Sequence, residues 1–497
     1  MDNNLKRYFA YRNRLDTYLY AMRVITIEGE TIAPKKAYQE RGEALSVLNN
    51  EYLALSLSDE FNDIIKNLEK NYDKYDEKIK RLIKLERKKY DLEKKVPINL
   101  QNKYVNLVNE TQHFWHTAKE KDDYSIFEPY FDKLINKTLE IATYYGKTNG
   151  SYYNTFLDMY EEGITTEILD SFFNNLKENL VPLIKRISES NITIRDDFLN
   201  RKVSKKKQMK VADYILKTIG FDLSRGLLQE SMHPFTDQLS KNDVRVTTHI
   251  YEDNFISNIY SCAHEGGHGI YEQNLNSKLP SIVKDACSMS IHESQSRLYE
   301  NIIARSYEFT KLTYPKIQKL VKPVLDDVSL DEYYKAINKV SPSLIRTEAD
   351  EVTYCLHVLI RYEIEKMIFN REITAKDIPS IWNQKYQEYL GVTVTSDKVG
   401  VLQDSHWAGG AFGYFFSYAL GNAYSGQIAH YLTQEINFEN LNNNTLKSIK
   451  KWLIKNIYQY GSLYPSKELI KNINNEEFNS KYYIDYLINK YKKIYNL

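Results

Sequence analysis

The stretch SCAHEGGHGIYEQ, residues 261–273, holds the pattern around which the rest of the chain is organised. Its His264, Glu265 and His268 form an HExxH motif. On a helix, residues four apart lie one above the other on the same face, so both imidazoles can reach one ion. Glu265 lies beside His264, where it can accept a proton from water. The motif predicts a helix with two metal ligands and a general base; two helix-face histidines without metal are the alternative.

Three glycines, Gly266, Gly267 and Gly269, lie within or directly after this motif, in a chain of 497 residues that has only 18. Each costs about 1 kcal/mol in a helix interior relative to alanine. We therefore expect another backbone, or a substrate, to pass close against this helix. A poorly formed helix end is the alternative.

A catalytic zinc site needs a third protein ligand and an open position. Glu293 lies on the next predicted helix, 282–306, whose antiparallel return would bring its carboxylate back to the ion. Glu300, about two turns later, is the alternative third ligand. Glu272 continues the face of His268 but lies about 6 Å further along the axis, which suits a supporting role.

The ligand set of two histidines and one glutamate predicts one Zn²⁺ per chain, although Co²⁺ or Mn²⁺ fits the same donors. His292 points away from Glu293 on a helix, so we expect it to line the site or to pack. A further carboxylate should orient one of the two ligand histidines. The sequence leaves open which carboxylate this is.

The scarcity of turn-forming residues determines the fold class. The chain has 18 Gly and 11 Pro, far below average usage of about 7% and about 5%. A β-sandwich or barrel needs a turn every 8–12 residues or so, so we predict an all-α fold. The exception is 243–251, DVRVTTHIY, where β-branched residues predict a short strand near the metal motif.

The chain shows no Gly/Ser-rich or Pro-rich linker, which predicts a single domain over 1–497. Within it, 1–200 form an N-terminal helical part and 201–497 the catalytic part with the metal motifs. The heavily charged segment 71–95 predicts a solvated, protruding helical hairpin, with a partner-binding arm as the alternative.

Charge and composition bear on partners and compartment. The 67 Lys+Arg balance 66 Asp+Glu, so we expect no nucleic-acid partner. No run of 18 apolar residues is present, so we expect no membrane span. The start, MDNNLKRYFAYRNRL, shows no apolar signal-peptide region. The small, odd number of cysteines, three, is typical of proteins in a reducing compartment. We therefore expect a cytoplasmic protein.

Further motifs occur in a fixed order along the chain. They are HPF at 233–235, DxRxT at 243–247, HExxH at 264–268, HESQ at 292–295, IRxxAD at 345–350, GxxQDxHW at 400–407 and GYFFSYALGN at 413–422. With these motifs the sequence closely resembles the carboxypeptidase Taq-type metallocarboxypeptidases, a family of helical zincins. Phe416 stands where the family pattern has proline, and 1–200 match only by length and helicity.

The resemblance implies a large helical zincin-like body, saddle-shaped, with a deep central groove and usually a homodimer. It implies removal of single residues from peptides with a free C-terminus, with broad specificity and proline as a poor leaving residue. By position, His264, His268 and Glu293 are the family's metal ligands and Glu265 is its general base.

The resemblance also indicates the remaining roles. Tyr418 and His406 are candidates to stabilise the oxyanion. Arg346, in the IRxxAD motif, is the first candidate to bind the substrate carboxylate, since a guanidinium does so with two hydrogen bonds. Arg245 is the second, with an ion pair to Asp243 or Asp404 as the alternative. His233 is a third substrate-binding candidate, although it suits loop positioning better.

Two other functions compete. A helical zincin oligoendopeptidase or dipeptidase would share HExxH and Glu293 but lack the carboxylate-binding arginine. Such endopeptidases usually have Asp four residues after the third ligand, where this chain has Arg297. An inactive metal-binding scaffold is the second alternative. The presence of Glu265 argues against it, because a general base is dispensable for binding metal alone.

Overall fold

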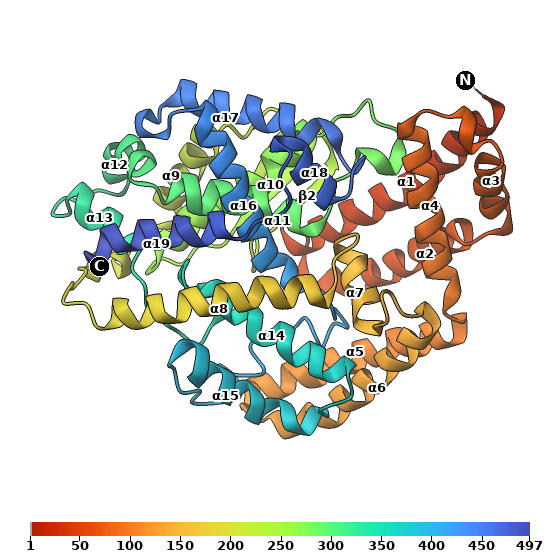
Figure 1. The fold of residues 1–497 in the computed structure, drawn as a ribbon, viewed down its shortest axis with the longest axis horizontal. Coiled ribbons are helices and arrows are strands. Elements are labelled where there is room, and N and C mark those ends of the chain that lie inside the picture. Colours follow the sequence, from red (N-terminus) through yellow and green to blue (C-terminus); the bar gives the residue numbers. More distant parts are fainter. Residues whose placement is uncertain (1) are drawn as a thin grey trace.

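The computed structural model describes residues 2–497 and consists of helices with one small sheet (Figure 1). The first part of the chain is entirely helical, as predicted. Its helices are α1 (Asn3–Glu30), α2 (Tyr38–Ser56), α3 (Asp59–Glu69), α4 (Glu77–Lys95), α5 (Ile98–Lys121), α6 (Glu128–Tyr145), α7 (Tyr152–Tyr160) and α8 (Thr166–Ser188).

The remaining helices include α10, which carries the metal motif. They are α9 (Lys205–Ile219), α10 (Phe255–Asn274), α11 (Met289–Arg297), α12 (Tyr307–Val321), α13 (Leu330–Ile337), α14 (Tyr354–Phe369), α15 (Ile378–Leu390), α16 (Phe416–Glu435), α17 (Asn443–Asn456), α18 (Ser466–Asn474) and α19 (Lys481–Tyr495). The all-α prediction with minor β structure is confirmed. In the part of the chain that the structure describes, no helix is long and apolar enough to cross a membrane.

The charged segment 71–95 does not protrude. Within it, α4 buries Leu82, Ile83 and Tyr90. Its Arg81 pairs with Glu162 at 2.6 Å and donates to the Ser462 carbonyl, which ties the N-terminal helices to the C-terminal part. The prediction of a solvated helix therefore holds for one face only, because the other face packs.

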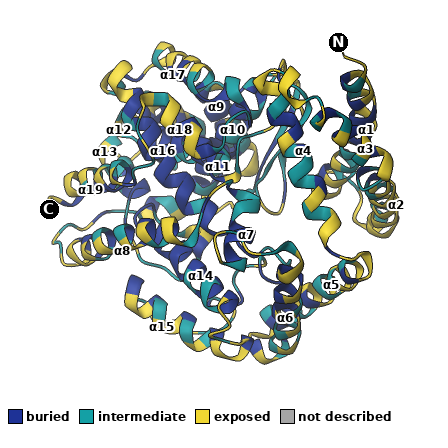
Figure 2. Ribbon diagram, turned by 45° about the vertical axis from the view of Figure 1, so that its right-hand side comes forward, coloured by how far each residue is buried: buried dark blue, intermediate teal, exposed yellow. Residues whose placement is uncertain are grey.

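Two large hydrophobic clusters account for most of the interior, beside a minor group of three buried residues. The larger cluster contains buried side chains from Trp115 to Tyr495. The smaller one joins α1–α4 with Leu279 and Val283 of the loop after α10. Figure 2 shows α11 and α16 dark with buried residues at the centre, while α2, α5 and α15 carry exposed faces. The metal motif lies in the larger cluster.

A three-stranded sheet lies beside the metal motif. Strand β3 (Asp243–Thr248) is central, with β1 (Gly226–Glu230) parallel to it and β2 (Thr236–Ser240) antiparallel. Val244 and Val246 of β3 are buried, and β2 and β3 contact α10. The predicted strand is confirmed, though it ends three residues earlier than the sequence pattern.

Helix α11 packs against both α10 and α16. A Cβ at Gly267 of α10 would lie 2.8 Å from the Gln295 carbonyl of α11, and one at Gly421 of α16 would lie 2.6 Å from Glu293 Cβ. The expected close approach of another backbone to the motif helix is therefore confirmed. Only glycine allows α10 and α16 to lie this close to the helix that carries Glu293.

The predicted helix 282–306 consists of a 3₁₀ turn and, after a break, an α-helix that continues directly into a π-helical turn. A 3₁₀ turn spans Ser281–Lys284, and α11 begins only at Met289, where the Ser288 hydroxyl caps the Ile291 N–H. A π-helical turn, Leu298–Ala304, follows α11. The sequence pattern missed the break because the N-cap serine lies inside an otherwise continuous apolar periodicity.

Candidate metal centre and active site

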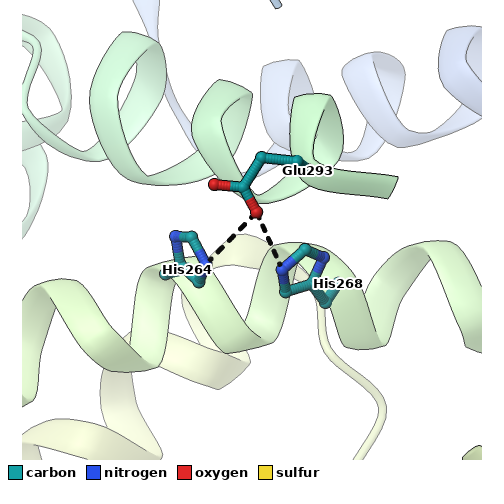
Figure 3. A group of neighbouring side chains, drawn as sticks. All are labelled: His264, His268 and Glu293. Carbon is teal, nitrogen blue, oxygen red and sulfur yellow. Dashed lines mark ion pairs between the residues drawn. The ribbon is translucent and has the colours of Figure 1, made fainter. Parts of the chain in front are cut away.

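His264, His268 and Glu293 meet between α10 and α11 (Figure 3). The helical spacing of four brings the two rings to a centroid distance of 4.9 Å. Glu293 Oε2 lies 3.8 Å from His264 Nε2 and 3.5 Å from His268 Nε2. The three predicted ligands are therefore the residues that the fold brings together.

These donor atoms fit a divalent metal. Ligands 2.0–2.1 Å from a tetrahedral zinc lie about 3.3–3.4 Å apart, close to the distances found here. Burial lowers the pKa of His268 to about 3, helped by the neighbouring His292. His268 is thus neutral at physiological pH, as a ligand must be. The residues present suit the ion that the sequence predicts.

A carboxylate orients one of the two predicted ligand histidines. Glu300 Oε2 lies 2.9 Å from His264 Nδ1, which directs Nε2 of that ring toward Glu293. Glu300, the alternative third ligand, therefore lies behind His264 rather than among the donor atoms. Glu272 has the supporting place expected for it, with Oε1 2.7 Å from His292 Nε2. The His292 ring in turn packs on His268 at a centroid distance of 4.4 Å.

Glu265 lies beside the ligands and is buried. Its Oε2 accepts a hydrogen bond from the Thr236 hydroxyl at 2.7 Å. Burial raises the pKa of Glu265, although the His264 ring and Thr236 oppose this. A carboxylate with a raised pKa is a better proton acceptor from water, as a general base requires. Strand β2 thus fixes the predicted base from a position 29 residues before it in the sequence.

A cavity of about 570 Å³ opens at this group. Its lining includes His264, Glu265, Glu293, Arg346 and Tyr418. The Tyr418 hydroxyl lies 3.1 Å from His406 Nε2. His406 is therefore connected to the cavity through Tyr418, and burial lowers its pKa to about 4. Of the other predicted residues, Tyr418 and Arg346 line the same cavity as His264 and Glu293.

Arg346 is buried and held rigidly. Its Nη2 pairs with Asp404 at 2.8 Å, and its Nη1 donates to the Tyr354 hydroxyl at 3.2 Å. Its guanidinium lies 4.9 Å from the centroid of the Tyr418 ring. Arg361 pairs with the other oxygen of Asp404 at 2.6 Å. One aspartate therefore fixes two arginines, one of which borders the cavity.

Arg245 and His233, the other two substrate-binding candidates, are not among the residues that line this cavity. Arg245 pairs with Asp243 at 3.1 Å and with Glu28 of α1 at 3.0 Å, so the ion-pair alternative describes its contacts, with Glu28 as an additional partner. His233 is exposed in the loop before β2, and its neighbour Pro234 is the residue of that loop which lines the cavity. Substrate binding by Arg245 and His233 stays a prediction.

A buried carboxylate holds the segment that carries His406. Glu365 of α14 accepts from Trp407 Nε1 at 2.8 Å, from the Gly413 N–H at 2.9 Å and from the Tyr153 hydroxyl at 2.7 Å. The segment 391–415 contains no α-helix or strand. Glu365 therefore supplies hydrogen bonds that regular secondary structure would otherwise provide.

Sequence reasoning missed Thr236, Arg361 and Glu365 because their partners lie far away along the chain. From the sequence, Arg297 stands out only as a departure from the endopeptidase pattern. Its spacing of four residues from Glu293 was an available signal, since such pairs meet on a helix face.

Comparisons with known proteins agree with this geometry. The profile of the carboxypeptidase Taq (M32) metallopeptidase family matches residues 7–491. Carboxypeptidase 1 of Bacillus subtilis is 40% identical over 495 residues, covering 99% of each chain. Thermostable carboxypeptidase 1 of Pyrococcus furiosus is 34% identical over 505 residues, again covering 99% of each.

The fold is also that of a solved relative. The crystal structure of an M32 carboxypeptidase from Deinococcus radiodurans superposes with a TM-score of 0.96 at 27% identity, covering all of both chains. A full-length sequence match and a full-length structural match thus coincide with a His/His/Glu group on an HExxH helix. The chain belongs to the carboxypeptidase Taq (M32) family of metallopeptidases.

Proposed function

We propose that this metallocarboxypeptidase removes single residues from the free C-termini of peptides, with His264, His268 and Glu293 holding one Zn²⁺ and Glu265 acting as general base. The observation that carries the proposal is the single cavity lined by His264 and Glu293 of the His/His/Glu group, by Glu265 and by the buried Arg346. A base beside a metal site performs hydrolysis, and a fixed arginine in the same cavity selects a carboxylate.

When bound, the metal polarises the scissile carbonyl and increases the acidity of the attacking water. Glu265 takes the proton of that water, and Thr236 keeps its carboxylate in place. Glu265 then returns the proton to the leaving amine, since it is the ionisable group placed for both transfers.

Tyr418 stabilises the oxyanion in this proposal. With the proton of neutral His406 on Nε2, that ring donates to the Tyr418 oxygen across their 3.1 Å contact. The phenolic hydrogen is then free to point into the cavity at the developing charge. Replacing Tyr418 with Phe should lower kcat about 10²–10³-fold and change KM little.

Arg346 binds the substrate carboxylate. Asp404 accepts from its Nε and Nη2, and the Tyr354 hydroxyl accepts from its Nη1, so the guanidinium is held in one orientation at the cavity. Because the side chain is immobilised before binding, little conformational entropy is lost on capture. The endopeptidase alternative has no comparable role for this arginine.

The test is mass spectrometry of N-terminally blocked peptides incubated with the enzyme. Successive loss of single C-terminal residues is expected, abolished by a chelator and lowered about 10²–10⁴-fold by Glu265→Gln. Internal cleavage, or equal activity on a C-terminally amidated peptide, would contradict the proposal. Metal binding without any turnover would favour the inactive scaffold.

Three finer features belong to this proposal: Zn²⁺ as the ion, a homodimer as the assembly and the cytoplasm as the compartment. The donor set favours zinc, and the free cysteines 262, 287 and 355 suit a reducing compartment. Metal analysis of the purified protein, its mass by light scattering and cell fractionation test them in turn.

A further inference from the structure

The two carboxylate oxygens of Glu293 have different partners, and Arg297 contacts only one of them. Its Nε donates to Glu293 Oε1 at 2.6 Å. The other oxygen, Oε2, faces His264 and His268. The carboxylate therefore turns one oxygen toward the donor group and keeps the other in a hydrogen bond with the guanidinium.

The same guanidinium reaches the carboxylate behind His264. Arg297 Nη1 donates to Glu300 Oε2 at 3.2 Å, and that oxygen also faces His264 Nδ1. The ring of Tyr354 lies 4.3 Å from the guanidinium carbon. Glu293 and Arg297 are four residues apart on α11, and Glu300 follows three residues later in the π-helical turn, within reach of the same guanidinium. Arg297 thus joins the third ligand to the partner of the first.

We propose that Arg297 is a positioning residue that keeps Glu293 a one-oxygen ligand and holds His264 in place through Glu300. A carboxylate with two free oxygens can bind a metal through both. Two-oxygen binding would fill the coordination position that a catalytic site must leave open. The hydrogen bond from Arg297 to Oε1 withholds that oxygen from the metal. This inference rests on the ligand set proposed above.

Only a guanidinium suits both contacts. Its planar fork donates from Nε to one carboxylate and from Nη1 to another, with the aromatic face of Tyr354 alongside. A lysine ammonium in the same place supplies charge but not two donors in a fixed plane. The side chain is 13% exposed, so water offers little replacement for the lost donors.

The test uses protein loaded with Co²⁺ in place of the native ion, read by visible absorption. The bands of Co²⁺ weaken as the number of ligands rises, because the site becomes more nearly centrosymmetric. In Arg297→Met, which keeps side-chain volume, Glu293 should bind through both oxygens and the bands should weaken several-fold. Arg297→Lys should give an intermediate spectrum. A Met or Lys variant with the wild-type spectrum would overturn the proposal.

Arg305→Met is the matched control. Arg305 is also largely buried, lies 3.6 Å from Glu300 and contacts the Tyr260 ring, but it makes no contact with Glu293 among the described ion pairs. Its variant should keep the wild-type bands. The same weakening in Arg305→Met would show an effect of charge alone and contradict the positioning role. Circular dichroism confirms that each variant is folded.

Failure of the positioning role and failure of the ligand set are distinguishable. If His264→Ala binds Co²⁺ as tightly as the wild type, the ligand set is wrong. If His264→Ala loses the ion while Arg297→Met keeps the wild-type spectrum, only the role of Arg297 is wrong. A crystal structure of zinc-loaded Arg297→Met gives a second readout, in which Glu293 Oε1 should have joined the metal.

Discussion

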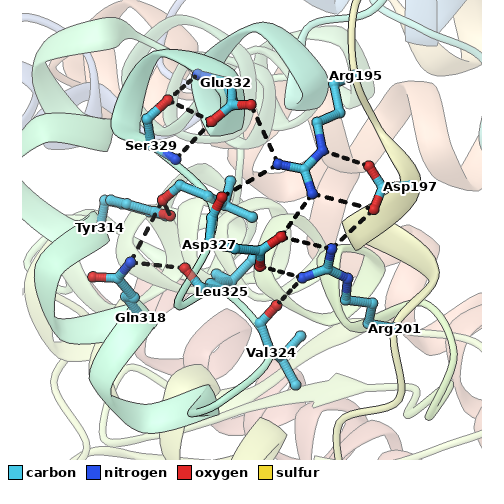
Figure 4. Close-up of polar contacts among 11 residues, drawn as sticks. Arg195, Asp197, Arg201, Tyr314, Gln318, Val324, Leu325, Asp327, Ser329 and Glu332 are labelled. Atoms are coloured by element: carbon cyan, nitrogen blue, oxygen red, sulfur yellow. Dashed lines mark hydrogen bonds and ion pairs between the residues drawn. The ribbon is translucent and has the colours of Figure 1, made fainter.

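Two arginine–carboxylate clusters in this molecule have similar chemistry and opposite surroundings. On the surface, Arg195 and Arg201 share Asp327, and both also pair with Asp197 (Figure 4). In the interior, Arg346 and Arg361 share Asp404. The side chain of Asp327 is 55% exposed and that of Asp404 only 10%.

Burial decides what each cluster does. Water and salt screen the surface pairs, which join the loop before α9 to the loop before α13 at little net gain. The buried pairs have no such screening, so each charge depends on its partner. Arginine partners hold the pKa of Asp404 far below its usual range despite burial. The interior cluster can therefore fix Arg346 at the cavity, whereas the surface cluster only fastens loops.

Breaking the buried cluster should have the largest effect. Asp404→Ala leaves two guanidinium groups buried without their shared partner, which should cost about 3–5 kcal/mol of unfolding free energy. Urea unfolding measures this loss, and the KM for peptides should rise because Arg346 loses its anchor. Asp197→Ala is the surface control. Equal shifts in the two variants would contradict the comparison.

Glu365 is a buried carboxylate that, unlike Asp404, has no arginine among the partners described above. Burial raises the pKa of Glu365 to about 7, although hydrogen bonds from Tyr153, Trp407 and Gly413 oppose the rise. Between pH 4.5 and 7 the folded protein therefore binds a proton that the unfolded chain has released. The contribution of Glu365 to stability should therefore fall as pH rises through this window, by up to about 3 kcal/mol.

Glu365→Gln removes that titration. The unfolding free energy of the variant, relative to the wild type, should increase as the pH is raised from 4.5 to 8. Urea unfolding at several pH values checks this difference. A difference that does not change with pH would show that Glu365 has an ordinary pKa.

Replacing Glu300, the carboxylate behind His264, should have an intermediate effect, which falls on metal binding rather than on folding. Glu300→Gln keeps a polar group near His264 Nδ1 but loses the charge that Arg297 and His264 share. Metal affinity should weaken about 10–100-fold, measured by competition with a chelator. Glu272→Gln, which loses only the contact with His292, is the control and should bind metal more tightly than Glu300→Gln.

The surface cluster should give the smallest effect. Arg201→Gln removes the pairs with Asp197 and Asp327, both of which are exposed. The unfolding midpoint should fall slightly at low ionic strength, and the difference should vanish when salt is added. A large loss that persists in high salt would show that the surface pairs stabilise the fold as the buried pairs do.

Local patterns explain most of what could be predicted. The HExxH spacing depends only on helix periodicity, and Glu293 needed only an antiparallel return of the next helix. The strand at 243–248 followed from β-branched residues. The break before Met289 was not predicted, because one capping serine ended an apolar pattern that looked continuous. The packed face of α4 was also missed, since its charged residues outnumber its apolar ones.

The sequence by itself determined the helical class and the placement of the candidate ligands His264 and His268 and the candidate base Glu265 on α10, because these depend on residues a few positions apart. Only the tertiary structure decided which groups support them. Thr236 reaches Glu265 from a strand, and Asp404 joins Arg346 to Arg361 from an irregular segment. The physical reason is that helix geometry is set locally, whereas a buried charge finds its partner through the packing of distant segments.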